Sequence, residues 1–207
     1  MTSHELLDKA NAAKAKGDYK GAIFALTELI KKGPTSVDAR ELSSAALGAA
    51  HMERAECFEH LNNPTDAYCD YMEALAYAPL AASDDARKAI YLRLLELCRK
   101  MDDELYAVMF GLQAILAEAV LRIHERRGEE LARLRAQADE RVAALLGPAV
   151  DGARRTALQA LVHKYIDSDD MAIDVRVVEF ELPEAMAKVL GKKPDDMYGE
   201  PTSGRRI

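Results

Sequence analysis

The chain has 207 residues, of which 49% are hydrophobic and 30% charged, a balance that favours a folded core and argues against an intrinsically disordered protein. Its formal net charge of −7 argues against nucleic acid as a partner. Aromatic residues make up only 6%, tryptophan is absent and alanine is frequent, a composition that favours closely packed helices.

Three further features indicate the compartment. The longest apolar run, Leu112 to Ile123, is interrupted by Gln113 and Glu118 and is too short to span a bilayer. The N-terminal residues lack the charged-then-apolar layout of a signal peptide. The cysteines are odd in number and lie in helical patterns, so we interpret them as reduced thiols: Cys57, Cys69 and Cys98. We therefore expect a cytoplasmic protein, in a reducing compartment, with no membrane span.

Two helical hairpins are predicted first. Ser3 is a candidate N-cap for the first helix, which ends at Gly17-Asp18, and Gly33-Pro34 ends the second helix. A third helix is expected to begin at Ser36 or Asp38 and to run about 23 residues to Leu61. The turn 62–64 then leads into a fourth helix, capped by Thr65 and running to Tyr77.

A fifth helix is predicted to open at 83–85, and a third hairpin begins at 102–103, with Gly111 where a bulky residue is expected. No proline interrupts residues 104–146, which would extend about 65 Å as one helix. A break near Gly128 is the simplest alternative. Gly147-Pro148 ends this element, and a further helix covers about 150–166.

Residues 171–182 alternate between apolar and charged side chains, a pattern typical of a β-strand, with a phase slip at Val177-Val178 that suggests a bulge. A lone strand cannot satisfy its backbone hydrogen bonds, so it would pair with another chain by β-augmentation or homo-oligomerisation, or pad the helical body. A short helix led by Pro183 and a flexible tail from Lys192 follow. The strand-pairing candidates are Ile173, Val175, Val177, Phe180 and Leu182.

The hairpin residues recur at one spacing: Gly17 and Asn62, Ala22 and Ala67, and Pro34 and Pro79 are each 45 positions apart. Small residues at fixed positions and a closing proline allow antiparallel helices to pack closely and to stack on a neighbouring hairpin. This pattern resembles the tetratricopeptide repeat over residues 3–118. The matches are Gly17, Tyr19, Ala22, Leu26 and Pro34 in one unit and Ala55, Phe58, Leu61, Ala67, Tyr71, Ala74 and Pro79 in the other, while Leu6 and His51 stand where the family has a large aromatic.

The resemblance implies an all-α fold of about three hairpins with a protein-binding groove lined by the first helix of each. The expected domains are 3–118 (hairpins), 119–147 (continuation of a long helix), 148–191 (helix, strand and short helix) and 192–207 (tail). Candidate groove residues are Asn11, Lys14, Arg54, Phe58, Lys88 and Tyr91. The chaperone-binding branch of the family clamps a carboxylate; here Asn11 and Lys88 match that clamp, whereas Leu7, Glu53 and Leu92 depart from it.

We find no motif for catalysis, no metal-ligand spacing and no cofactor-binding loop. Cys57 and His60 lie one helical turn apart and could form a thiolate–imidazolium pair, although a packed thiol beside a surface histidine is the simpler interpretation. The sequence therefore predicts a non-enzymatic adaptor or scaffold that binds a peptide or domain of another protein in its groove. The alternatives are a constitutive structural subunit, held in an assembly by the long helix and the strand, and a chaperone cofactor.

Overall fold

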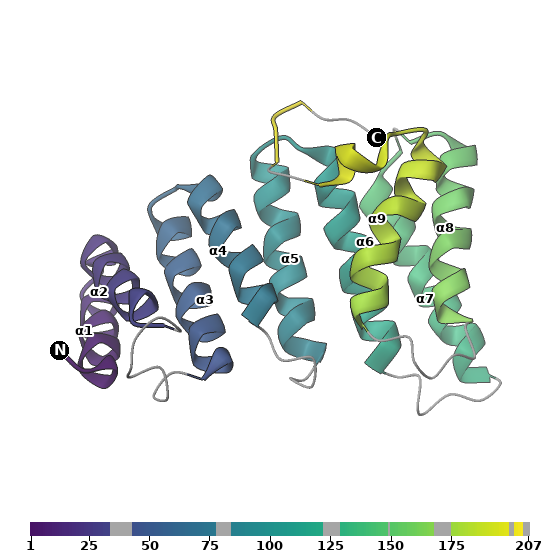
Figure 1. Ribbon diagram of the computed structural model, residues 1–207. Coiled ribbons are helices and arrows are strands. Elements are labelled where there is room, and N and C mark those ends of the chain that lie inside the picture. Colours follow the sequence, from purple (N-terminus) through teal and green to yellow (C-terminus); the bar gives the residue numbers. More distant parts are fainter. Residues whose placement is uncertain are drawn as a thin grey trace. The chain divides into compact units, whose positions relative to one another are not determined.

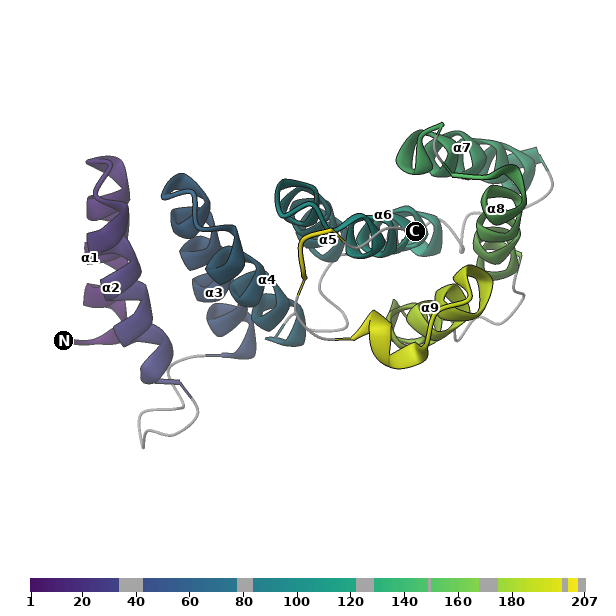
Figure 2. The same ribbon diagram turned by 90° about the horizontal axis from the view of Figure 1, so that it is seen from above.

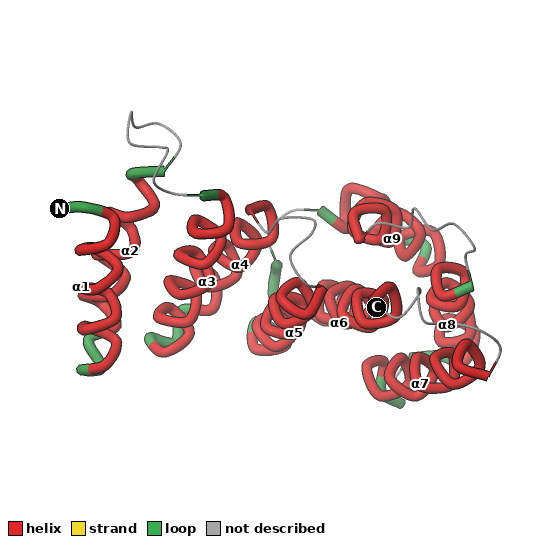
Figure 3. The backbone as a smooth tube through the Cα atoms, turned by 90° about the horizontal axis from the view of Figure 1, so that it is seen from below, coloured by secondary structure: helices red, strands yellow, loops and turns green. Residues whose placement is uncertain are grey.

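A computed structural model describes residues 1–33, 43–77, 84–121, 129–148, 150–167, 175–198 and 201–204. Every regular element in these ranges is a helix, as the tube in Figure 3 shows. The chain divides into two compact units, Met1–Ala82 (unit 1) and Ser83–Ile207 (unit 2), which are described separately. The all-helical class is confirmed for the described residues; the four domains expected from the sequence and the tetratricopeptide arrangement stay predictions.

Unit 1 contains two antiparallel helical hairpins (Figure 1). The first joins α1 (Ser3–Ala15) to α2 (Tyr19–Lys31), and the second joins α3 (Ser44–His60) to α4 (Pro64–Tyr77). The small residues predicted to allow close packing are buried: Ala22 and Ala67 are both 0% exposed. The N-cap of α1 is Thr2 rather than Ser3, because Thr2 and Glu5 form a capping box. The predicted starts of the third helix and the predicted prolines Pro34 and Pro79 lie outside the described residues.

Each hairpin turn uses the same backbone chemistry. The second residue after the first helix of each hairpin has a positive φ, 75° at Gly17 and 54° at Asn62, a conformation that glycine and asparagine adopt at low cost. The next residue caps the following helix: the Asp18 carboxylate accepts a hydrogen bond from the Gly21 amide at 2.9 Å. A break followed by an Asx cap is therefore the local signal that makes these segments hairpins rather than long helices.

Unit 2 opens with a third hairpin, α5 (Asp84–Lys100) and α6 (Glu104–Leu121), whose turn has φ 59° at Asp102 and an N-cap at Asp103. Every residue from Leu105 to Ala117 is buried, so α6 is the centre of the unit. Around it lie α7 (Glu129–Leu146), α8 (Gly152–Ile166) and α9 (Val175–Leu190), as Figure 2 shows.

Residues 104–121 and 129–146 form two antiparallel helices, and not one continuous helix through 119–147. The side chain of Arg141 on α7 bonds Glu118 on α6, while Leu145 lies against Gly111, about two turns earlier on α6. A straight helix would hold residues 111 and 145 about 50 Å apart. Packing against the apolar α6 therefore decides the arrangement. Residues 122–128 lie outside the described part of the chain.

The predicted strand at 171–182 is wrong where the structure describes it. Val175, Val177, Phe180 and Leu182 belong to helix α9, and Ile173 lies outside the described residues. The phase slip is the physical reason, since it places apolar residues at 175, 178, 182 and 186, a spacing that also suits a helix. Leu182 is 0% exposed on α9, so burial within unit 2 replaces the expected pairing with another chain.

The described part of the predicted flexible tail packs against unit 2. Residues Pro194–Met197 form a 3₁₀ helix, η2, and Met197 is buried. Farther on, the backbone amide of Thr202 donates a 2.7 Å hydrogen bond to the carboxylate of Asp103, the N-cap of α6. The third hairpin turn thus holds the C-terminal segment as well as capping its own helix.

Candidate functional site

The candidate site is a groove of about 440 Å³ in unit 2, bounded by α5, α6 and α7 and called here the α5–α7 groove. Seven apolar or small residues line it: Leu92, Leu95, Gly111, Ala114, Ile115, Ala144 and Leu145. Three cationic side chains complete the lining: Lys88, Arg99 and Arg141. None of these residues is a serine, cysteine, histidine or carboxylate, and the amine of Lys88 is hydrogen-bonded to Glu118.

The groove follows from helical spacing on α5 and from small residues on α6. Lys88, Leu92, Leu95 and Arg99 stand at i, i+4, i+7 and i+11, which places them on one face of α5. On α6, a Cβ added at Gly111 would lie 2.5 Å from Leu145 Cδ1, so only glycine lets α7 approach this closely. Leu92 remains 43% exposed, which leaves an apolar edge open to solvent.

An ion-pair cluster closes one end of the groove. Glu118 Oε2 accepts a hydrogen bond from Arg141 Nη1 at 2.6 Å and another from Lys88 Nζ. The Arg141 hydrogen bond is the largest influence on this carboxylate; partial burial opposes it, Lys88 adds to it, and the pKa of Glu118 falls to about 2. Glu118 is therefore ionised at any physiological pH, and two cations share one carboxylate.

The residues predicted for the groove are distributed over both units. Lys88 lines the α5–α7 groove, and its role in binding stays a prediction. Tyr91 is only 1% exposed, so its side chain is not available at a surface. In unit 1, Asn11 is exposed and Phe58 is half-buried.

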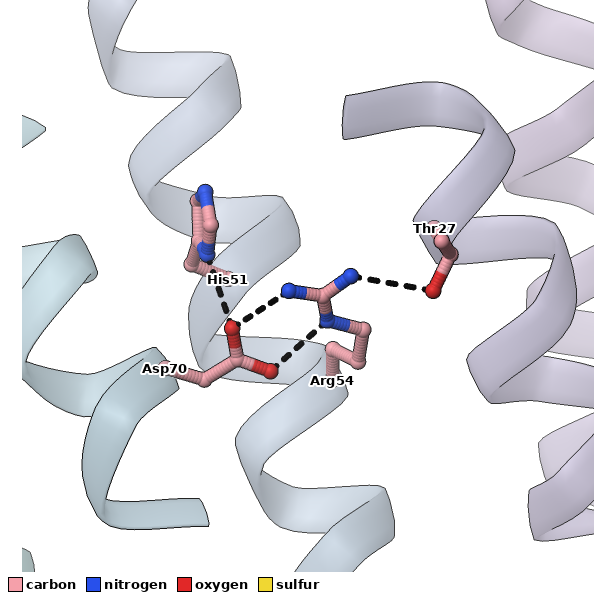
Figure 4. A network of polar contacts seen from close by, with 4 residues as sticks. All are labelled: Thr27, His51, Arg54 and Asp70. Atoms are coloured by element: carbon pink, nitrogen blue, oxygen red, sulfur yellow. Dashed lines mark hydrogen bonds and ion pairs between the residues drawn. The ribbon is translucent and has the colours of Figure 1, made fainter. Parts of the chain in front are cut away.

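The remaining two candidates, Lys14 and Arg54, form ion pairs within unit 1. The ammonium of Lys14 lies 3.4 Å from a carboxylate oxygen of Glu53 and 3.7 Å from one of Glu56. Arg54 lies in a polar network that also contains Thr27, His51 and Asp70 (Figure 4).

That network joins three helices of unit 1. Arg54 on α3 donates to both oxygens of Asp70 on α4, at 2.7 and 2.6 Å, and to the Thr27 hydroxyl on α2 at 2.9 Å. His51 Nδ1 lies 2.9 Å from Asp70 Oδ1. Burial alone would raise the pKa of Asp70, but the hydrogen bonds from Arg54 and His51 outweigh burial and lower it. We interpret the network as structural, because Asp70 and His51 are only 3% and 6% exposed and no substrate could reach them.

Sequence reasoning recognised His51 only as a departure from the family pattern. In the structure its ring stacks on Tyr77 with centroids 5.6 Å apart while its nitrogen bonds Asp70. The imidazole ring of His51 therefore makes a ring contact with Tyr77, as an aromatic residue could, and also a hydrogen bond with Asp70. No sequence signal joins residues 51 and 70, because they lie on different helices.

The possible thiolate–imidazolium pair is not formed. Cys57 is 0% exposed, and burial raises the pKa of its thiol, which favours the unreactive protonated form. His60 instead stacks on Tyr19, with ring centroids 4.2 Å apart. Among the described residues, no group of three or more His, Cys, Asp or Glu side chains could hold a metal ion.

None of the helices in the described ranges combines the length and hydropathy required to cross a bilayer. Comparisons of the chain with models of known protein families, with curated proteins and with solved structures gave no match. The residues of the α5–α7 groove are therefore the basis for assigning a function.

Proposed function

We propose that this protein is a non-enzymatic adaptor, built of tetratricopeptide-like helical hairpins, that binds a segment of another protein in the α5–α7 groove. The observation that carries the proposal is the open apolar lining of that groove. Leu92 is 43% exposed on one wall, and the buried residues Leu95, Gly111 and Ala114 form the apolar base beside it. Exposed apolar surface rimmed by charge is typical of a protein-binding site.

The shape of the lining favours a helical partner over a small metabolite. The lining residues of α5 extend from Lys88 to Arg99, which corresponds to about 16 Å along the helix axis, or three turns. An amphipathic helix presents a stripe of this length through residues at i, i+4, i+7 and i+11. Leu145 occupies the space at Gly111, so such a helix would pack on the exposed edge at Leu92 rather than insert side chains at the floor.

The structural-subunit alternative loses its support, since it depended on a continuous long helix and a C-terminal strand. The described residues contain two antiparallel helices in place of the first and α9 in place of the second. The chaperone-cofactor alternative gains none, because Leu7, Glu53 and Leu92 stand at three of the clamp positions.

Affinity purification with paired variants tests the proposal. Leu92→Glu places a charge on the exposed apolar edge of the groove, whereas Arg93→Glu changes the neighbouring exposed residue, which does not line the groove. We expect the proteins recovered with wild type and with Arg93→Glu to be absent with Leu92→Glu, as measured by quantitative mass spectrometry. Recovery of the same proteins with all three would refute the groove as the binding surface.

A further inference from the structure

We propose that the partner segment of the α5–α7 groove is an amphipathic helix with acidic ends, and that its carboxylate competes with Glu118 for Lys88 and Arg141. The inference rests on the proposed function, since it specifies the chemistry of the partner in the same groove. Glu118 then acts as a built-in competitor that occupies the cationic end of the groove when no partner is bound.

The charge count at this end of the groove is the first argument. Arg141 and Lys88 bond the same carboxylate oxygen of Glu118, so two positive charges face one negative charge. The side chain of Glu118 is only 14% exposed, whereas those of Lys88 and Arg141 are 29% and 48% exposed. The cations are thus reachable from solvent while their internal partner lies beneath them. A carboxylate arriving from outside meets a net positive charge.

The opposite end of the groove has a third cation, Arg99. Arg99 stands eleven positions after Lys88 on α5, about 16 Å away along the helix axis. Its contact with Glu96, 3.0 Å long, joins two side chains that are 48% and 57% exposed, and exposed pairs of this kind are weak. An incoming carboxylate can therefore engage Arg99 with little loss.

These positions define the partner. Its apolar stripe must cover about three turns to match the lining between Lys88 and Arg99. An acidic residue at each end of that stripe would meet a cation, whereas a basic residue would be repelled. Apolar burial would supply most of the affinity, and the acidic ends would supply selectivity, because a carboxylate that replaces Glu118 exchanges one ion pair for another.

Two matched synthetic peptides test the inference on the full chain. Each has about 14 residues, with leucines at helical spacing on one face and alanine and glutamine elsewhere. One carries two glutamates at each end, and its twin carries glutamines there. Fluorescence anisotropy gives Kd for both with wild type, Glu118→Gln and Lys88→Gln. Glu140→Gln serves as a control, since it removes an exposed carboxylate of α7 that does not line the groove.

We expect wild type to bind the glutamate peptide about fivefold more tightly than its twin. Glu118→Gln should strengthen binding of the glutamate peptide severalfold and leave the twin unchanged, and Lys88→Gln should reduce the preference. Added salt should weaken only the glutamate peptide. Circular dichroism checks that each variant folds. Lys88→Gln and Glu118→Gln change opposite members of one ion pair and are expected to shift the peptide preference in opposite directions, so the test does not depend on one variant.

Equal affinity for both peptides would overturn this inference and leave the proposed function standing. Binding of neither peptide would also overturn the inference. The proposed function would still stand, because the Leu92→Glu capture experiment tests it independently. Tight binding of palmitate with neither peptide bound would overturn it in favour of a fatty-acid ligand, for which cations beside an apolar lining are also suitable.

Discussion

Asparagine in place of Asp70 is expected to destabilise unit 1 by about 3 kcal/mol. Asp70 is 3% exposed and accepts hydrogen bonds from Arg54 at both oxygens, and its Oδ1 also contacts His51. Removing one partner of a buried ion pair costs about 3–5 kcal/mol, because the other charge stays buried. We take the lower end of this range, since the Arg54 side chain is 18% exposed and keeps some access to water.

Native-state hydrogen exchange on the full chain measures this loss for each unit separately. A cost of about 3 kcal/mol corresponds to roughly 100-fold lower protection of the α3 and α4 amides, while those of α6 should not change. Glu73→Gln is the control, because it removes an exposed carboxylate from the same helix and should cost less than about 0.5 kcal/mol. A loss of less than about 1 kcal/mol for Asp70→Asn would refute the reasoning.

The pH dependence of the same variant gives a second readout. Because the pKa of Asp70 is lowered on folding from the usual 3.8, its contribution to stability is complete above that value and is lost as the pH falls through the lower folded pKa. The difference in protection between wild type and Asp70→Asn should therefore be largest near neutral pH and shrink below about pH 4. A difference that grows on acidification would have the wrong sign for this network.

Three further predictions concern unit 2. Gly111→Ala should destabilise the α6–α7 contact by about 1 kcal/mol, since its Cβ would lie 2.5 Å from Leu145 Cδ1. The cost of overpacking, about 1–3 kcal/mol, exceeds the gain of about 1 kcal/mol in helix propensity. Increased protection of the α6 amides in hydrogen exchange would contradict this prediction. Glu118→Gln should make the free energy of unfolding fall less steeply as the pH decreases from about 4.5 to 2. The folded pKa of Glu118 is lowered to about 2, so the stabilising effect of its carboxylate disappears as the pH falls through that range. Urea titrations at several pH values measure this dependence, and an unchanged profile would count against the ion-pair cluster. Asp103→Asn should release the Thr202 segment yet keep the cap of α6, whereas Asp103→Ala should lose both, with a cost of about 1 kcal/mol; limited proteolysis separates release of the tail from loss of the cap, and equal effects of the two variants would disprove the distinction.

The hairpins could be predicted from the sequence because their determinants are local. Gly17-Asp18 and Asn62-Asn63 each combine a residue suited to positive φ with an Asx cap, and the structure places a hairpin turn at both. Asp102-Asp103 carries the same signal less visibly, since aspartate is less typical of a positive φ than glycine. The alanines at the repeat positions, Ala22, Ala55, Ala67 and Ala74, are all buried.

The C-terminal part was misread because its signal is ambiguous at short range. Alternation over 171–177 is typical of a strand, and Pro183 suggested the first turn of a new helix. The helical spacing of the same residues becomes clear only when the apolar positions after Pro183 are included. These positions are buried in the structure: Met186, Ala187 and Leu190. A strand could not have found a partner among the helices of the described residues, so tertiary packing overrode the local pattern.

Half of the groove could be predicted and half could not. One face of α5, with Lys88 and Arg99 at its ends, follows from helical spacing alone. The opposite wall exists because α7 packs antiparallel to α6, which brings Arg141 to Glu118. Residues 122–128, between these two helices in the sequence, lie outside the described part of the chain. A sequence reading of residues 104–146 as one helix separates these two residues by about 34 Å.

Gly111 connects the repeat pattern to the proposed site. In the sequence it is the position where the third hairpin departs from the repeat pattern, since a regular repeat has a bulky residue there that packs between the two helices of the hairpin. In the structure that missing side chain is the space into which Leu145 fits. The glycine that departs from the repeat pattern therefore lets α7 pack closely against α6, and the groove lies between α5 and α7. A chain with a regular third repeat would keep Lys88 and Leu92 on α5 but would have no facing wall, and hence no α5–α7 groove for a partner to enter.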